Sequence, residues 1–180
     1  EQPSEDLDVH MGRYDLLCQD CHTTSKHEIA GKGSGLPTSS NRLKCEQCHG
    51  AHPHANSQAV AFHLESHLDN MTCQTCHIPS FAKESPTKLF WDWSKAGKNL
   101  PVEKDQYGMP TFSKQDGAAI WGKDVVPSYR WTDGRTTHYA IGDTIDPKGI
   151  TTLAGPVGSI KDKHARIHPY KHFTALQPYD

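Results

Sequence analysis

Three five-residue motifs combine cysteine and histidine, residue types that bind metals and cofactors. They read Cys18-Gln19-Asp20-Cys21-His22, Cys45-Glu46-Gln47-Cys48-His49 and Cys73-Gln74-Thr75-Cys76-His77. C-x-x-C-H is the attachment pattern of c-type haem, in which both cysteines form thioethers and the histidine binds the iron. The motifs contain all six cysteines of the chain, so the sequence predicts three covalent haem c groups. The proximal iron ligands would be His22, His49 and His77, and the thioethers would form at Cys18, Cys21, Cys45, Cys48, Cys73 and Cys76.

Two other uses of paired cysteines fit less well. Six cysteines could form three disulfides in a secreted protein, but a disulfide framework needs no histidine after every second cysteine. Two C-x-x-C pairs can build one tetrahedral zinc site. Three pairs do not divide into such sites, and zinc does not require the repeated Cys-His step.

A low-spin haem also needs a sixth iron ligand, usually histidine or methionine. Methionine is scarce, with three in the chain, whereas ten histidines lie outside the motif positions. These are His10, His27, His52, His54, His63, His67, His138, His164, His168 and His172. Bis-histidine ligation is therefore the economical interpretation, and it implies lower reduction potentials than His/Met ligation.

Chain reach narrows the choice of sixth ligand. His27 follows His22 by five positions, and five extended residues span at most about 17 Å. Passing around a haem to its far face takes about that much stretched chain, so His27 is better placed to serve a neighbouring haem. The same argument applies to His52 and His54 relative to His49. His10 and His67 precede motifs at distances that permit either choice.

Composition excludes several classes of function. The formal net charge is −2 and no basic patch suggests nucleic-acid binding. No apolar run approaches the roughly 20 residues that cross a bilayer. Because haem is attached to C-x-x-C-H outside the cytoplasmic membrane, we expect a periplasmic or extracellular protein in mature or trimmed form.

The hydrophobic content is 34% of residues, which is thin for a core made of protein alone. Three porphyrins could replace side-chain core, so without haem we expect the first 77 residues to be largely disordered.

Two parts are expected along the chain. The motifs begin at residues 18, 45 and 73, which defines a trihaem-binding part over 1–80. Residues 81–180 contain no such motif and hold all four tryptophans, and we expect this part to pack on or cap the haems. A helix is predicted over Ser57–Asp69 and a loop over Gly31–Ser40. Val125–Trp131 and Thr136–Ile141 could pair as a small hairpin around Asp133-Gly134.

Several segments carry a resemblance to a known family. They are Asp8-Val9-His10-Met11, the three motifs, His27-Glu28-Ile29-Ala30-Gly31, Pro53-His54, Ile78-Pro79, Phe90-Trp91-Asp92-Trp93 and Gln177-Pro178-Tyr179-Asp180. The chain resembles an internal three-haem portion of the octahaem tetrathionate reductase family of multihaem c-type cytochromes. The resemblance implies a mostly irregular and helical fold with little strand. It also implies bis-histidine ligation, with distal ligands among His10, His27, His54 and His67.

The chain departs from that family in one respect. Family members carry eight haems, and their catalytic haem has a lysine ligand in a motif that is absent from this sequence. The main hypothesis is therefore electron transfer through three bis-histidine haems, with redox proteins or further copies of the chain as partners and no open haem for catalysis. The alternatives are a fragment or relative of a reductase of sulfur or nitrogen oxyanions, and a subunit of a conductive extracellular filament with ligands crossing between subunits.

Overall fold

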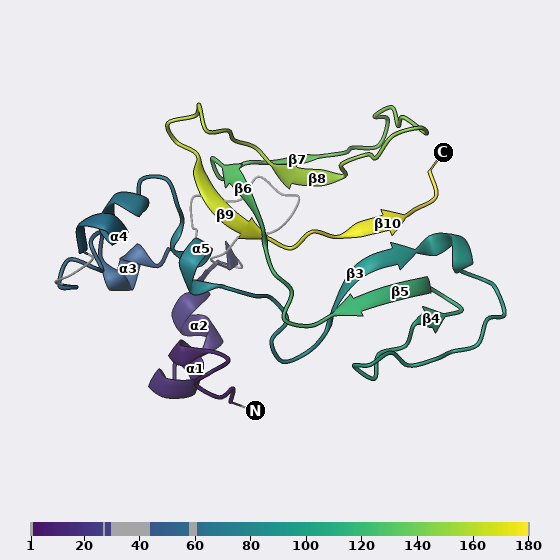
Figure 1. Ribbon diagram of the computed structural model, residues 1–180, viewed down its shortest axis with the longest axis horizontal. Coiled ribbons are helices and arrows are strands. Elements are labelled where there is room, and N and C mark those ends of the chain that lie inside the picture. Colours follow the sequence, from purple (N-terminus) through teal and green to yellow (C-terminus); the bar gives the residue numbers. More distant parts are fainter. Residues whose placement is uncertain (1, 27, 30–43, 58–60, 180) are drawn as a thin grey trace.

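The computed structural model describes residues 2–26, 28–29, 44–57 and 61–179. Short helices gather at one end of the molecule, and strands make up much of the rest (Figure 1). Of the described residues, 18% are helical and 26% lie in strands or bridges. The expectation of a mostly irregular and helical fold with little strand is therefore wrong. Most of the strands lie after residue 86 and pair with segments that are distant in the sequence. Hydrophobic periodicity within one segment predicts such pairing poorly.

The helices are short and contain no buried residue among those described. They are α1 Val9–Tyr14, α2 Cys18–Cys21, α3 Glu46–His49, α4 Ala61–His67 and α5 Cys73–His77, followed by the 3-10 helix η1 Trp93–Lys95. Isolated helices below about 12 residues are marginal in water. Their stability must therefore come from what packs around them.

Helix α1 places His10 near its beginning. The Asp8 carboxylate accepts hydrogen bonds from the backbone N–H groups of His10 and Met11 at 2.9 and 3.0 Å, a standard N-cap. The helix ends at Asp15, which adopts the left-handed conformation with φ 54°. The short capped helix thus fixes the backbone that carries His10.

The strands form one larger sheet and three ribbons. The sheet has the order β10-β3-β5-β4, with β3 antiparallel to β5 and parallel to β10. The ribbons pair β1 with β2, β6 with β9 and β7 with β8, all antiparallel. The bounds are β1 Thr24–Ser25, β2 Glu28–Ile29, β3 Thr87–Asp92, β4 Phe112–Ser113, β5 Gly117–Gly122, β6 Ser128–Thr132, β7 Thr136–His138, β8 Ala154–Pro156, β9 Arg166–Tyr170 and β10 Thr174–Leu176.

The hairpin predicted around Asp133-Gly134 is wrong in its pairing. Strands do form on both sides of this turn, but β6 pairs with β9 and β7 pairs with β8. A small hairpin does occur in this half, between β4 and β5. The Asp-Gly signal marked a real turn, whereas each strand pairs with a segment 16 to 42 residues away in the sequence.

The helix predicted over Ser57–Asp69 is present as α4 Ala61–His67. Residues 58–60 and the loop predicted over Gly31–Ser40 lie outside the described residues.

Few side chains are buried in the part of the chain that the structure describes. Phe112 and Ala165 are 5% and 3% exposed, and the buried polar residue is Asp92 at 8%. Asp92 ends β3 and caps η1, since its Oδ1 accepts hydrogen bonds from Ser94 N at 3.0 Å and Ser94 Oγ at 2.6 Å. This small core agrees with the low hydrophobic content of the sequence, because few side chains are buried among the described residues.

Candidate haem-binding centre

Each C-x-x-C-H motif occupies one helical turn. The His22 N–H donates to Cys18 O at 2.7 Å, and the His49 N–H donates to Cys45 O at 3.0 Å. The third motif coincides with α5 Cys73–His77. Because residues three apart share a helix face, each pair of cysteines lies on one side of its turn. That arrangement suits two bonds to a single flat group.

His10 and His49 face each other although 39 residues separate them. Their Nε2 atoms are 3.5 Å apart, and their ring centroids lie 5.8 Å apart at an interplanar angle of 71°. A distance of 3.5 Å is long for a hydrogen bond. It is close to the roughly 4 Å spanned by two metal–imidazole bonds of about 2 Å each. The pair therefore fits two ligands on opposite sides of one metal ion.

His54 and His77 form a second histidine pair. Their rings are within 3° of parallel, and their centroids are 6.2 Å apart. This distance between the ring centroids is similar to that of His10 and His49. The pair brings the segment that follows the second motif next to the third motif. His54 thus lies opposite the histidine of a neighbouring motif, not beside His49 of its own.

His27 and His67 are the other two candidates for a sixth ligand. His27 lies outside the described residues. His67 is the last residue of α4, and its side chain is exposed. His22, the proximal candidate of the first motif, follows α2 and is also exposed.

The carboxylate of Glu65, on α4, holds the segment that carries His54. Its Oε1 accepts the backbone N–H of His54 at 2.7 Å, and its Oε2 lies 3.0 Å from His52 Nδ1. Burial opposes ionisation of Glu65. The hydrogen bonds from His54 and His52 and the proximity of the two imidazoles outweigh burial and hold the pKa of the carboxyl below its usual value.

Sequence reasoning missed Glu65 as a site residue. Its position in the sequence could have indicated this role. Glu65 is the one acidic residue before Asp69 in the predicted helix, and it lies between His63 and His67.

The second and third motifs lie against each other. Cys73 neighbours Cys45, and burial and then the proximity of Cys73 raise the pKa of the Cys45 thiol. Gln74 Nε2 lies 3.8 Å from Cys45 Sγ. A cavity of about 200 Å³ adjoins both motifs. Its lining residues are Cys45, Glu46, His49, Gly50, Ala51, Pro53, Leu68, Cys73 and Arg166.

Strand β9 fixes the beginning of the third motif. The Thr75 hydroxyl donates to Ile167 O at 2.8 Å, and Thr72 N donates to the same carbonyl at 3.0 Å. Ile167 N donates in turn to Asn70 O at 2.7 Å, and Thr72 Oγ1 lies 2.9 Å from His168 Nδ1. The part without haem motifs therefore contributes directly to the position of α5 (Figure 1).

The zinc and disulfide alternatives gain no support from these contacts. All six cysteines are free. Within the described ranges, no group of three or more Cys, His, Asp or Glu side chains converges to hold a metal ion.

Comparison with known proteins identifies the chain. The profile of a family described as "Cytochrome c bacterial" matches residues 88–180, just over half of the sequence. The chain belongs to this family of bacterial cytochromes c. No curated protein matches it.

A solved structure, the octaheme cytochrome c from Shewanella oneidensis, is similar to this cytochrome over nearly its whole length. The two are 42% identical with a TM-score of 0.84, and the match covers 96% of this chain. The resemblance to a portion of an octahaem cytochrome family is thereby confirmed. The cytochrome spans 39% of the length of the octaheme chain.

The surface of the cytochrome fits a chain that wraps large apolar groups. Its accessible area is 13,740 Å², against about 8,700 Å² expected for a folded monomer of this mass. Large apolar side chains such as Ile141, Ile150 and Phe62 are 108%, 97% and 82% exposed. The motif cysteines and histidines are themselves half-buried or exposed, and so accessible for haem attachment.

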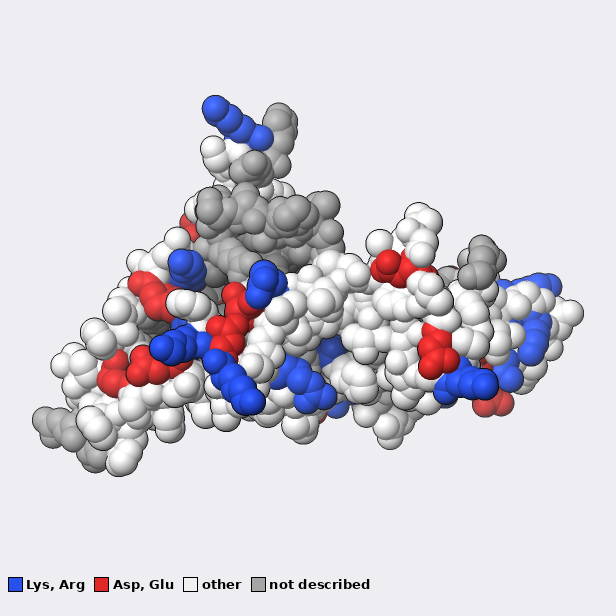
Figure 2. Space-filling view, turned by 90° about the horizontal axis from the view of Figure 1, so that it is seen from above, with Lys and Arg blue, Asp and Glu red and all other residues white. Residues whose placement is uncertain are grey.

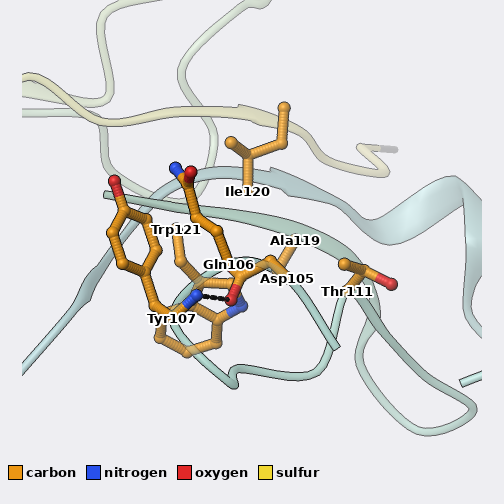
Figure 3. Close-up of a pocket in the computed structure, with 7 residues that line it drawn as sticks. All are labelled: Asp105, Gln106, Tyr107, Thr111, Ala119, Ile120 and Trp121. Atoms are coloured by element: carbon orange, nitrogen blue, oxygen red, sulfur yellow. Dashed lines mark hydrogen bonds between the residues drawn. The ribbon is translucent and has the colours of Figure 1, made fainter. Parts of the chain in front are cut away.

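A second cavity, of about 290 Å³, lies away from the motifs against β5 (Figure 3). Tyr107 and Trp121 give it aromatic walls, and Asp105 Oδ1 accepts the Tyr107 N–H at 2.9 Å across its base. Its lining contains no cysteine or histidine.

The charges of the cytochrome are intermixed on the face seen in Figure 2, where acidic and basic side chains adjoin. No described helix is long and apolar enough to cross a membrane.

Proposed function

We propose that this cytochrome transfers electrons through three haem c groups, each held by one C-x-x-C-H motif. The thioethers would form at the six motif cysteines, with His22, His49 and His77 as proximal ligands. The observation that carries the proposal is the facing of His10 with His49 and of His54 with His77. We assign His10 and His54 as the corresponding distal ligands.

When bound, haem c supplies a one-electron couple between ferric and ferrous iron. The chain supplies two imidazoles for each of two irons, which leaves neither iron a position for substrate. Bis-histidine ligation favours low potentials, since a methionine ligand would raise them. Because chain reach directs His27 to a neighbouring haem, the sixth ligand of the first motif is proposed to be His67.

Passage of electrons along the chain is supported by the contact between motifs. Cys45 and Cys73 line the same cavity, and Gln74 of the third motif lies 3.8 Å from Cys45 Sγ of the second. Groups attached at these two positions would have their edges close together. We propose redox proteins or further copies of the chain as partners, and the periplasm or cell exterior as the location.

The decisive experiment combines haem counting with ferric spectra of two variants. H10A and H54A should each convert one low-spin haem to high spin, while a pyridine haemochrome assay still counts three haems per chain. H138A is the matched control, because His138 is exposed on β7 and lies outside the motifs. Spectra of H10A and H54A identical to that of H138A would contradict the assignment.

A second candidate is membership in a larger multihaem reductase. It is favoured by one observation: the cytochrome matches 39% of an octaheme chain. An enzyme of this kind needs one iron without a strong sixth ligand. A high-spin ferric signal in the unaltered protein would support it, and three low-spin haems would oppose a catalytic haem in this chain.

A further inference from the structure

We propose that Glu65 is a positioning residue that selects the ring tautomer of His54 and so prepares its Nε2 for iron. The inference rests on the proposed function, because it takes His54 as a distal ligand. It assigns Glu65 a role beyond that of a surface carboxylate on α4.

One oxygen of Glu65 lies close to both the backbone N–H and the ring of His54. Oε1 accepts the His54 backbone N–H at 2.7 Å and lies 3.5 Å from His54 Nδ1. That ring nitrogen is shielded from solvent, and among the described residues it has no hydrogen bond of ordinary geometry. A buried polar nitrogen without a partner is costly. A small rotation of the ring towards Oε1 would supply the bond.

The chemistry of the partner determines the tautomer. An ionised carboxylate only accepts hydrogen bonds, so a nitrogen bonded to it must carry the proton. With the proton on Nδ1, the lone pair of the neutral imidazole is on Nε2. A ligand histidine bonded in this way to a carboxylate is a recurring arrangement in metal sites.

The second oxygen keeps the carboxylate in place. Oε2 lies 3.0 Å from His52 Nδ1, and the Glu65 side chain is 19% exposed whereas that of His52 is 79% exposed. Both oxygens are therefore engaged, one on each of two histidines. This restricts rotation of the carboxylate beside the His54 ring.

A carboxylate bonded to Nδ1–H makes the imidazole a stronger donor and favours ferric over ferrous iron. Replacing Glu65 by glutamine removes the charge and keeps the shape. We expect E65Q to shift the ferrous-to-ferric ratio of one haem about tenfold at a fixed applied potential. That shift is about +59 mV for a one-electron couple.

The test is a potentiometric titration of the holoprotein, followed by its absorption spectrum. E65Q should raise the potential of one haem while all haems stay low-spin, and E65D should return it towards the original value. E103Q is the charge-matched control, because Glu103 is exposed and lies in the part without haem motifs. Potentials of E65Q equal to those of E103Q would overturn the proposal.

A double-mutant cycle separates positioning from the mere proximity of a charge. The thioether of H54M has no N–H, so E65Q should have little further effect in the H54M background. An undiminished shift there would also overturn the proposal. If E65Q does not accumulate, nitrogen NMR of ¹⁵N-histidine-labelled original protein decides, and an unprotonated His54 Nδ1 would count against the inference.

Failure of the proposed function has a different signature. If H54A keeps every haem low-spin, His54 is not a ligand and the function assignment is wrong. If H54A yields a high-spin haem but E65Q behaves like E103Q, only the role of Glu65 is wrong.

Discussion

At the residue scale, carboxylates hold the backbone turns that carry the proposed ligand histidines. Asp8 caps the helix that carries His10, and Glu65 anchors the segment that carries His54. Asp133 likewise stabilises a backbone turn, the one between β6 and β7. Its Oδ1 accepts the Arg135 backbone N–H at 2.8 Å and its Oδ2 accepts Arg135 Nε at 2.7 Å.

The Asp133 carboxyl should make stability depend on pH. The hydrogen bond from the Arg135 side chain, with its backbone N–H and charge, holds the pKa of Asp133 below the usual 3.8. A lowered pKa stabilises the fold above the unfolded value, and this stabilisation is lost as pH falls through the folded value. D133N should therefore melt at a lower temperature than the original protein at neutral pH, and the difference should shrink below about pH 4.

Thermal melts at neutral and acidic pH would check this prediction. D6N is a suitable control, since Asp6 is an exposed residue near the amino-terminal end of the chain. A deficit in D133N that is the same at both pH values would mean that the ion pair is not the cause.

At the element scale, the sheet depends on one close approach of backbones. Gly117 begins β5 with φ +87°, and a Cβ built there would lie 2.1 Å from the Asp92 carbonyl oxygen. Gly108 has a similar φ of +76°, but a Cβ there would meet nothing within 4 Å. The two glycines thus share a backbone conformation and differ in steric room.

Replacing each glycine by alanine should separate the cost of a positive φ from the cost of a steric clash with Asp92. G108A should cost about 1–2 kcal/mol of unfolding free energy, the penalty of the left-handed conformation. G117A should cost more than that, because β3 and β5 must also move apart. Denaturant unfolding of both variants measures the difference. Equal losses would show that the approach of β5 to Asp92 is not restrictive.

At the scale of the whole molecule, the fold has more surface than protein packing explains. The described helices contain no buried residue, and the three motifs lie on these helices or directly beside them. Strand β9, in contrast, holds α5 from the half without motifs. Haem attachment should therefore order the motif half more than the strand half.

Protein produced without haem attachment should show this difference. We expect the first 77 residues to be largely disordered and rapidly cleaved in limited proteolysis, while the strands from β3 onward persist. Circular dichroism should lose its helical contribution relative to the holoprotein. Equal protease resistance of residues 1–77 in both forms would show that the chain builds this half without haem.

The sequence by itself determined the local chemistry. C-x-x-C-H is complete within one helical turn, so the candidate haem cysteines and histidines could be named without knowing the fold. The Asp133-Gly134 turn and most of the helix over Ser57–Asp69 were found for the same reason. Each depends on neighbouring residues, whose geometry is set by short-range hydrogen bonds and backbone preference.

Only the tertiary structure decided which distant segments meet. His10 faces His49 across 39 positions, Glu65 reaches back to His54, and β6 pairs with β9 in place of the expected neighbour. Such contacts depend on packing and on long-range strand pairing, which leave no periodic signal in a single sequence. Thirteen histidines offered many pairings, and the folded backbone brought His10 to His49 and His54 to His77.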